Sequence, residues 1–95
     1  MASTLDFKLP ENLTIANVQH LHEVLEDIID RKECDSIVLQ AESVQRADTA
    51  GLQLMLAFVN ASKNEHLTLS WKSPSEKLCS AASMLGLEEA LGIAS

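Results

Sequence analysis

The chain has 95 residues, enough for one domain with a real hydrophobic core, and 46% of its residues are hydrophobic. It contains only 3 Gly and 2 Pro, which favours a compact domain over a disordered segment. The formal charge of −7 argues against binding to nucleic acid or to an anionic membrane surface, because both favour basic patches. We therefore expect a single domain over residues 1–95.

The sequence predicts neither a signal peptide nor a membrane-spanning segment. Residues 1–6 lack the basic stretch and apolar run of a signal peptide, and no apolar run approaches the roughly 20 residues that span a bilayer. Cys34 and Cys79 are isolated, without the Cys-x-x-Cys spacing of zinc or redox sites. The sequence predicts a cytoplasmic protein without a metal or another cofactor.

The first part of the chain changes from strand patterns to a helix pattern and back. Apolar and polar residues alternate over residues 5–9, as in a half-buried strand, and residues 13–15 can return as a second short strand after a turn. From about residue 16 to 30 the apolar residues follow the helix period: Val18, Leu21, Leu25 and Ile28. Residues 36–41 are typical of a central strand covered on both faces.

Residues 44–52 read as a strand end, a sharp turn and the first turn of a helix. Asp48 is a predicted N-cap, because its carboxylate can accept from the free amides that open a helix, and Thr49 takes the first helical position. The helix is expected to run to about residue 63 and to be largely buried, with Met55 and Phe58 in the core. A hydroxyl at this tip is either a structural feature or a phosphate acceptor.

The last third predicts one more strand and a helix. Residues 66–71 alternate again, and Ser73, Pro74 and Glu76 form a capping box that would open the last long helix. The residues predicted for its buried stripe are Leu78, Ala81, Ala82 and Leu85, with Gly86 ending the helix and a short turn after it. The order of elements predicts an α/β fold, with a mixed sheet of four to five strands and three main helices packed on it.

The chain shows no catalytic or metal-binding constellation. His20 and His22 are two apart on a predicted helix, so they diverge, and no nucleophile–base pair or Gly-rich phosphate loop is visible. We therefore predict that the protein is not an enzyme. An acidic run on the first helix is most simply a solvated face, although it could contact a basic partner: Glu23, Glu26, Asp27 and Asp30.

The segment Asp48-Thr49-Ala50-Gly51-Leu52 resembles the signature of the STAS family, the domain of anti-sigma-factor antagonists and of sulfate-transporter tails. In that family the signature lies at the same strand-to-helix turn. The resemblance extends from Phe7 to Ile93 and includes Ser73-Pro74-Ser75 and residues 85–91. It implies the α/β fold predicted above and a stand-alone bacterial protein of the anti-sigma-factor-antagonist type.

The resemblance also implies a function. Thr49 occupies the place of the residue that a partner kinase phosphorylates in the antagonist branch, and residues 48–52 would contact the partner. That partner would be an anti-sigma-type serine/threonine kinase or a chemotaxis-type kinase. The alternative is a STAS subunit that binds and activates the ATPase of a phospholipid-trafficking ABC transporter, a branch that also uses the Asp-Thr-Ala-Gly form. The oligomeric state stays open.

Overall fold

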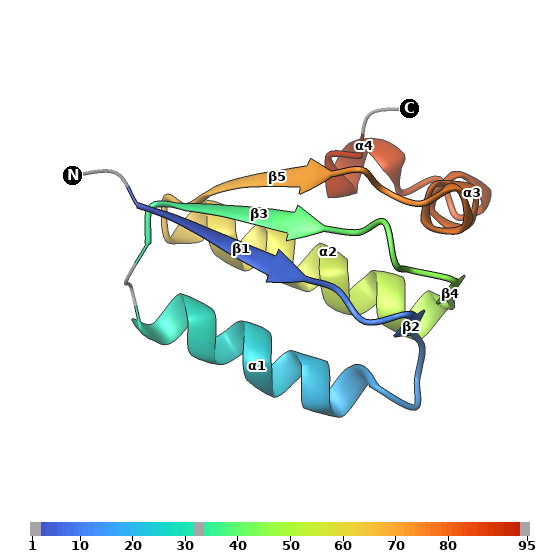
Figure 1. The fold of residues 1–95 in the computed structure, drawn as a ribbon, viewed down its shortest axis with the longest axis horizontal. Coiled ribbons are helices and arrows are strands. Elements are labelled where there is room, and N and C mark those ends of the chain that lie inside the picture. Colours follow the sequence, from blue (N-terminus) through green and yellow to red (C-terminus); the bar gives the residue numbers. More distant parts are fainter. Residues whose placement is uncertain (1–2, 32–33, 94–95) are drawn as a thin grey trace.

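The computed structural model describes residues 3–31 and 34–93, so Lys32 and Glu33 of the connection before the third strand lie outside it. One or two strands precede each of the helices α1, α2 and α3 along the chain, and α1 and α2 lie side by side under one face of a sheet (Figure 1). The elements in chain order are β1 (Thr4–Lys8), β2 (Asn12–Leu13), α1 (Val18–Arg31), β3 (Ser36–Gln40), β4 (Arg46–Ala47), α2 (Thr49–Asn64), β5 (Thr68–Lys72), α3 (Glu76–Met84) and α4 (Glu88–Leu91). The predicted α/β fold is confirmed.

The main sheet has the strand order β1-β3-β5, and both pairings are parallel. Parallel neighbours need a crossover between them, and here α1 and α2 supply it. The register places Phe7 beside Leu39 and Leu39 beside Trp71 on the face that the helices cover. The apolar side of each strand is thus aligned with the next.

The strands differ from the expected single mixed sheet. The described residues form five strands, but β2 and β4 make a separate parallel pair beyond the three-stranded sheet. The main sheet ends at the pair Lys8 and Gln40, and the small sheet begins at the pair Asn12 and Arg46. Three residues separate β1 from β2, whereas five separate β3 from β4. Pro10 lies in the shorter gap and has no N–H to donate, which contributes to the interruption of the ladder.

The core lies between the main sheet and its helices. Ile37 and Leu39 of β3 are fully buried, as are Leu52 and Met55 of α2. Phe58 is 4% exposed, so the assignment of Met55 and Phe58 to the core is confirmed. None of the helices within residues 3–31 and 34–93 is long and apolar enough to cross a membrane.

The prediction that β3 is covered on both faces was wrong. Its alternate residues Ser36, Val38 and Gln40 are only half-buried, and their neighbours in register on β1 and β5 are exposed. These neighbours are polar or charged, which lets this face of a parallel sheet stay in water: Thr4, Asp6, Lys8, Thr68, Ser70 and Lys72. None of the helices among the described residues covers this face of the sheet (Figure 1).

The start and the end of α3 also differ from the prediction. Its N-cap is Ser75, not Ser73, and the hydroxyl of Ser75 accepts from the backbone N–H of Leu78 at 3.1 Å. The same hydroxyl donates to the carbonyl of Val44 at 2.6 Å, and the Ser75 amide donates to the Ala41 carbonyl, so long-range bonds fix the cap. The helix ends at Met84, and Leu85, expected in the core, is 44% exposed.

Candidate functional site

The N-terminal tip of α2 is closed by the carboxylate of Asp48. Asp48 has extended backbone angles (φ −111°, ψ 178°), and its Oδ1 accepts from the backbone N–H of Gly51 at 2.9 Å. Thr49 is the first residue of α2. This is the geometry of an N-cap, in which a side-chain oxygen satisfies an amide that the helix itself leaves without a partner. The predicted cap and helix start are confirmed.

The second oxygen of Asp48 joins the tip to a segment that is distant in sequence. Its Oδ2 accepts from the backbone N–H of Ile15 at 2.9 Å, and the Asp48 amide donates to the Leu13 carbonyl at 3.0 Å. One carboxylate therefore holds the loop between β2 and α1 against the start of α2. The amides of Gly51 and Ile15, in that order, hold the pKa of Asp48 below its usual 3.8, because they stabilise the ionised form.

Gly51 allows α2 to approach β2 closely. A Cβ on Gly51 would overlap the carbonyl oxygen of Leu13 and lie 2.5 Å from the Leu13 carbonyl carbon. Both are backbone atoms, which cannot move aside as the end of a flexible side chain can. The close approach of β2 therefore requires a glycine at this position. Gly51 therefore supports the tip from behind.

The five motif residues divide between solvent and core. Thr49 is exposed, Asp48 and Ala50 are half-buried, and Gly51 and Leu52 are buried. The structure therefore brings the predicted residues together, with the Thr49 side chain on the solvent side and Leu52 anchored in the core. The arrangement leaves a hydroxyl at the surface of a rigidly held helix start.

Ile15 is part of this surface and was not identified from the sequence, which placed it in a strand. The strand β2 ends at Leu13, and the Ile15 side chain is 71% exposed although its amide is bound to Asp48. No local pattern signals this position, because the bond to Asp48 spans 33 residues of sequence. The loop that is bonded to Asp48 thus presents an exposed apolar side chain near the start of α2.

The chemistry of the tip suits binding or modification. Both Asp48 oxygens are engaged by amides and the pKa of Asp48 is lowered, so this carboxylate is a poor proton acceptor at neutral pH. His20, His22 and His66 are exposed, and His22 lies 3.5 Å from Glu26 of the same helix. Within the described part of the chain, no three His, Cys, Asp or Glu side chains gather as metal ligands do.

Comparisons with known proteins match this chain to one family model and to solved structures of the same fold. The family model described as "Mlab, STAS domain" matches residues 3–93. The fold is similar to that of a sulfate transporter family protein from Wolinella succinogenes, with a TM-score of 0.73 and 18% identity over 97% of this chain and 75% of that one.

The fold is also similar to that of the anti-sigma factor antagonist SpoIIAA in its unphosphorylated form. The TM-score is 0.72 and the identity 16%, over 100% of this chain and 94% of that one. Among curated proteins, none matches this chain.

Proposed function

The chain belongs to the STAS family, and from this membership we propose that it is a regulatory protein-binding module whose partner contacts the tip of α2. The observation that carries the proposal is the exposed hydroxyl of Thr49 at a helix start that Asp48 and Gly51 hold in place. The tip offers a partner the Thr49 hydroxyl and the exposed Ile15 side chain.

We further propose that phosphorylation of Thr49 releases the partner. A phosphate adds a charge of roughly −1.5 to −2 at pH 7. It would lie beside the ionised Asp48, which already occupies the Gly51 and Ile15 amides, so repulsion would oppose the attraction of the helix N-terminus. A partner fitted to the neutral tip would then meet a strongly negative one. SpoIIAA, which has this fold, was solved in a form distinguished as unphosphorylated, which supports the proposal.

The kinase of this switch would be an anti-sigma-type serine/threonine kinase or a chemotaxis-type kinase. A second partner class is the ATPase of a phospholipid-trafficking ABC transporter, which the protein would bind and activate. Two observations favour it: the motif has the Asp-Thr-Ala-Gly form of that branch, and one solved structure of the same fold comes from a sulfate transporter family protein. In both cases the protein would act in the cytoplasm as a binding module.

Affinity purification from the native host separates the two partner classes. The full chain serves as bait, Thr49→Glu as the matched negative bait, and mass spectrometry identifies the proteins that only the wild type retains. Recovery of a kinase would support the switch, whereas recovery of an ABC ATPase with its permease would assign the protein to a transporter.

A recovered kinase then provides the direct test of modification. Wild type, Thr49→Ala and Thr68→Ala are incubated with the kinase and ATP, and phosphate incorporation is measured. Thr68 is an exposed threonine of β5 and serves as the control. We expect Thr49→Ala alone to abolish incorporation, and incorporation that survives this change would contradict the proposed acceptor.

A further inference from the structure

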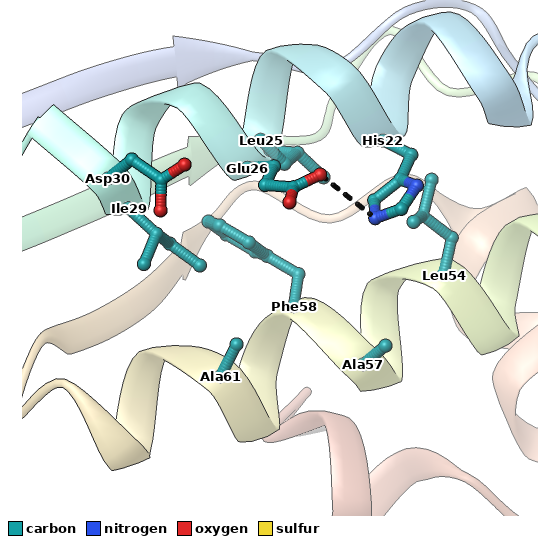
Figure 2. A pocket seen from close by; sticks show the side chains of 9 residues that line it. All are labelled: His22, Leu25, Glu26, Ile29, Asp30, Leu54, Ala57, Phe58 and Ala61. Carbon is teal, nitrogen blue, oxygen red and sulfur yellow. Dashed lines mark ion pairs between the residues drawn. The ribbon is translucent and has the colours of Figure 1, made fainter.

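A groove of about 320 Å³ runs between α1 and α2. Figure 2 shows that its side chains come from the two helices, which face one another across it. Phe58 and Leu25 form the floor, being 4% and 1% exposed. On α2 the short side chains of Ala57 and Ala61 leave the space that a larger residue would fill.

The two sides of the groove differ in charge. On α1, Glu26 and Asp30 follow His22 at four-residue intervals, so the three side chains lie in one row along the helix, and all three are exposed. The residues of α2 that line the groove are uncharged; of these, Leu54 is half-buried and Ala57 is exposed. The groove therefore has an apolar floor, one acidic rim and one neutral rim.

We propose that this groove docks one α-helix of a partner protein, amphipathic and with Lys or Arg along one flank. Its apolar residues would lie over Ala57 and Ala61, and its basic flank would face Glu26 and Asp30. A helix lying between two others is an ordinary packing solution, because side-chain ridges fit grooves between helices. Charge argues against a second copy of this chain as occupant, since each copy carries −7 and would bring more acid to an acidic rim.

The groove is separate from the tip of α2. Residues 54–61 begin five positions after Thr49, which places the groove roughly 8–18 Å further along the helix axis at 1.5 Å per residue. A partner could therefore hold the groove whether Thr49 is modified or not. The inference does not depend on the proposed phosphorylation.

A synthetic amphipathic peptide tests the inference. The probe is a 16-residue helix-forming peptide with leucines at i, i+3, i+4 and i+7 spacing and lysines along one flank, and its control carries glutamate in place of each lysine. Both are titrated calorimetrically against the full chain at low and at high ionic strength. We expect the lysine peptide to bind, more weakly at high salt, and the glutamate peptide not to bind.

Variants of the protein locate the binding site. Asp30→Lys should weaken the lysine peptide by about tenfold, because it replaces attraction by repulsion at the rim. Glu23→Lys changes the net charge equally on an exposed residue that does not line the groove, and should leave the affinity within about twofold. Ala57→Phe should abolish binding by filling the groove, whereas Thr49→Glu should have no effect.

Thermal melts of every variant establish that the fold is retained. Failure of the lysine peptide to bind would overturn the inference. So would equal weakening by Asp30→Lys and Glu23→Lys, or undiminished binding to Ala57→Phe. Self-association of the wild type in sedimentation, lost in Ala57→Phe, would assign the groove to a second copy instead.

Discussion

At the scale of single residues, Asp48 determines the shape of the tip because its two carboxylate oxygens serve different segments. Oδ1 caps α2 through Gly51, and Oδ2 holds the loop at Ile15. The cap was predictable from the sequence, since acceptor and donor are three residues apart and the side chain type is typical of caps. The bond to Ile15 was not predictable, because nothing in the local sequence relates two positions that folding brings together.

Gly51→Ala should destabilise the protein although alanine is the better helix former. The intrinsic gain is about 1 kcal/mol. The added Cβ would overlap the Leu13 carbonyl, and relieving that overlap means separating β2 from α2 at a cost of roughly 2–3 kcal/mol or more. Urea denaturation measures the free energy of unfolding. The control for helix propensity alone is Ala50→Gly, at the half-buried neighbouring position. A Gly51→Ala variant as stable as wild type would show that the contact with Leu13 does not determine stability at this position.

Asp48→Asn should remove a contribution to stability that depends on pH. The pKa of Asp48 is lower in the folded than in the unfolded chain, so its contribution is fully present above the unfolded value near 3.8 and is lost as the pH falls through the folded value. The difference in melting temperature between wild type and Asp48→Asn should be largest at neutral pH. It should shrink as the pH falls below about 4. A difference independent of pH between 7 and 2 would contradict the assigned role of the carboxylate.

At the scale of elements, the sequence predicted the start of α2 correctly and the start of α3 incorrectly. Asp48 stands directly before α2 as its candidate cap, whereas two serines, Ser73 and Ser75, precede α3 and each has a hydroxyl that can cap a helix. Tertiary bonds decide between them, because Val44 and Ala41 accept from Ser75 while Ser73 takes the left-handed conformation at φ 50°. The same limit explains Leu85: its place in the periodic stripe suggested burial, but the helix ends one residue before it.

Ser75→Ala should cost about 1–2 kcal/mol of stability. The change removes the cap on Leu78 and also the hydroxyl that donates to Val44 at 2.6 Å. Ser73→Ala is the matched control and should have a smaller effect, since Ser73 does not cap the helix. Chemical denaturation of both variants measures the difference. A larger loss for Ser73→Ala than for Ser75→Ala would contradict the assignment of the cap.

At the scale of the whole molecule, the fold leaves the two proposed contact surfaces on the helical side of the sheet. The open sheet face is polar and needs no cover, while α2 carries the tip at its N-terminus and the groove along its flank. The sequence predicted the α/β order and the capped start of α2, because periodicity and a contiguous motif are local. The groove was not predictable, because its shape depends on how α1 and α2 pack.

Thr49→Glu should impair partner binding without impairing folding. Thr49 is exposed in the free protein, so a charge there stays hydrated and the melting temperature should change little, as for surface substitutions that alter stability by less than about 0.5 kcal/mol. In the complex the same charge would enter a drier interface beside Asp48. A buried unpaired charge of this kind costs about 3 kcal/mol, which corresponds to a loss of affinity of roughly 150-fold.

The control for Thr49→Glu is Thr49→Gln, which has nearly the same size and no charge. Each variant is melted and then titrated against the purified partner from the affinity experiment. If charge is responsible, Thr49→Gln should lose much less affinity than Thr49→Glu, because its amide is cheaper to desolvate than a carboxylate. Equal losses for both variants would show that the interface responds to the size of the side chain. Equal affinity of wild type and Thr49→Glu would exclude a charge-operated switch at Thr49 and leave the residue as the opening turn of α2.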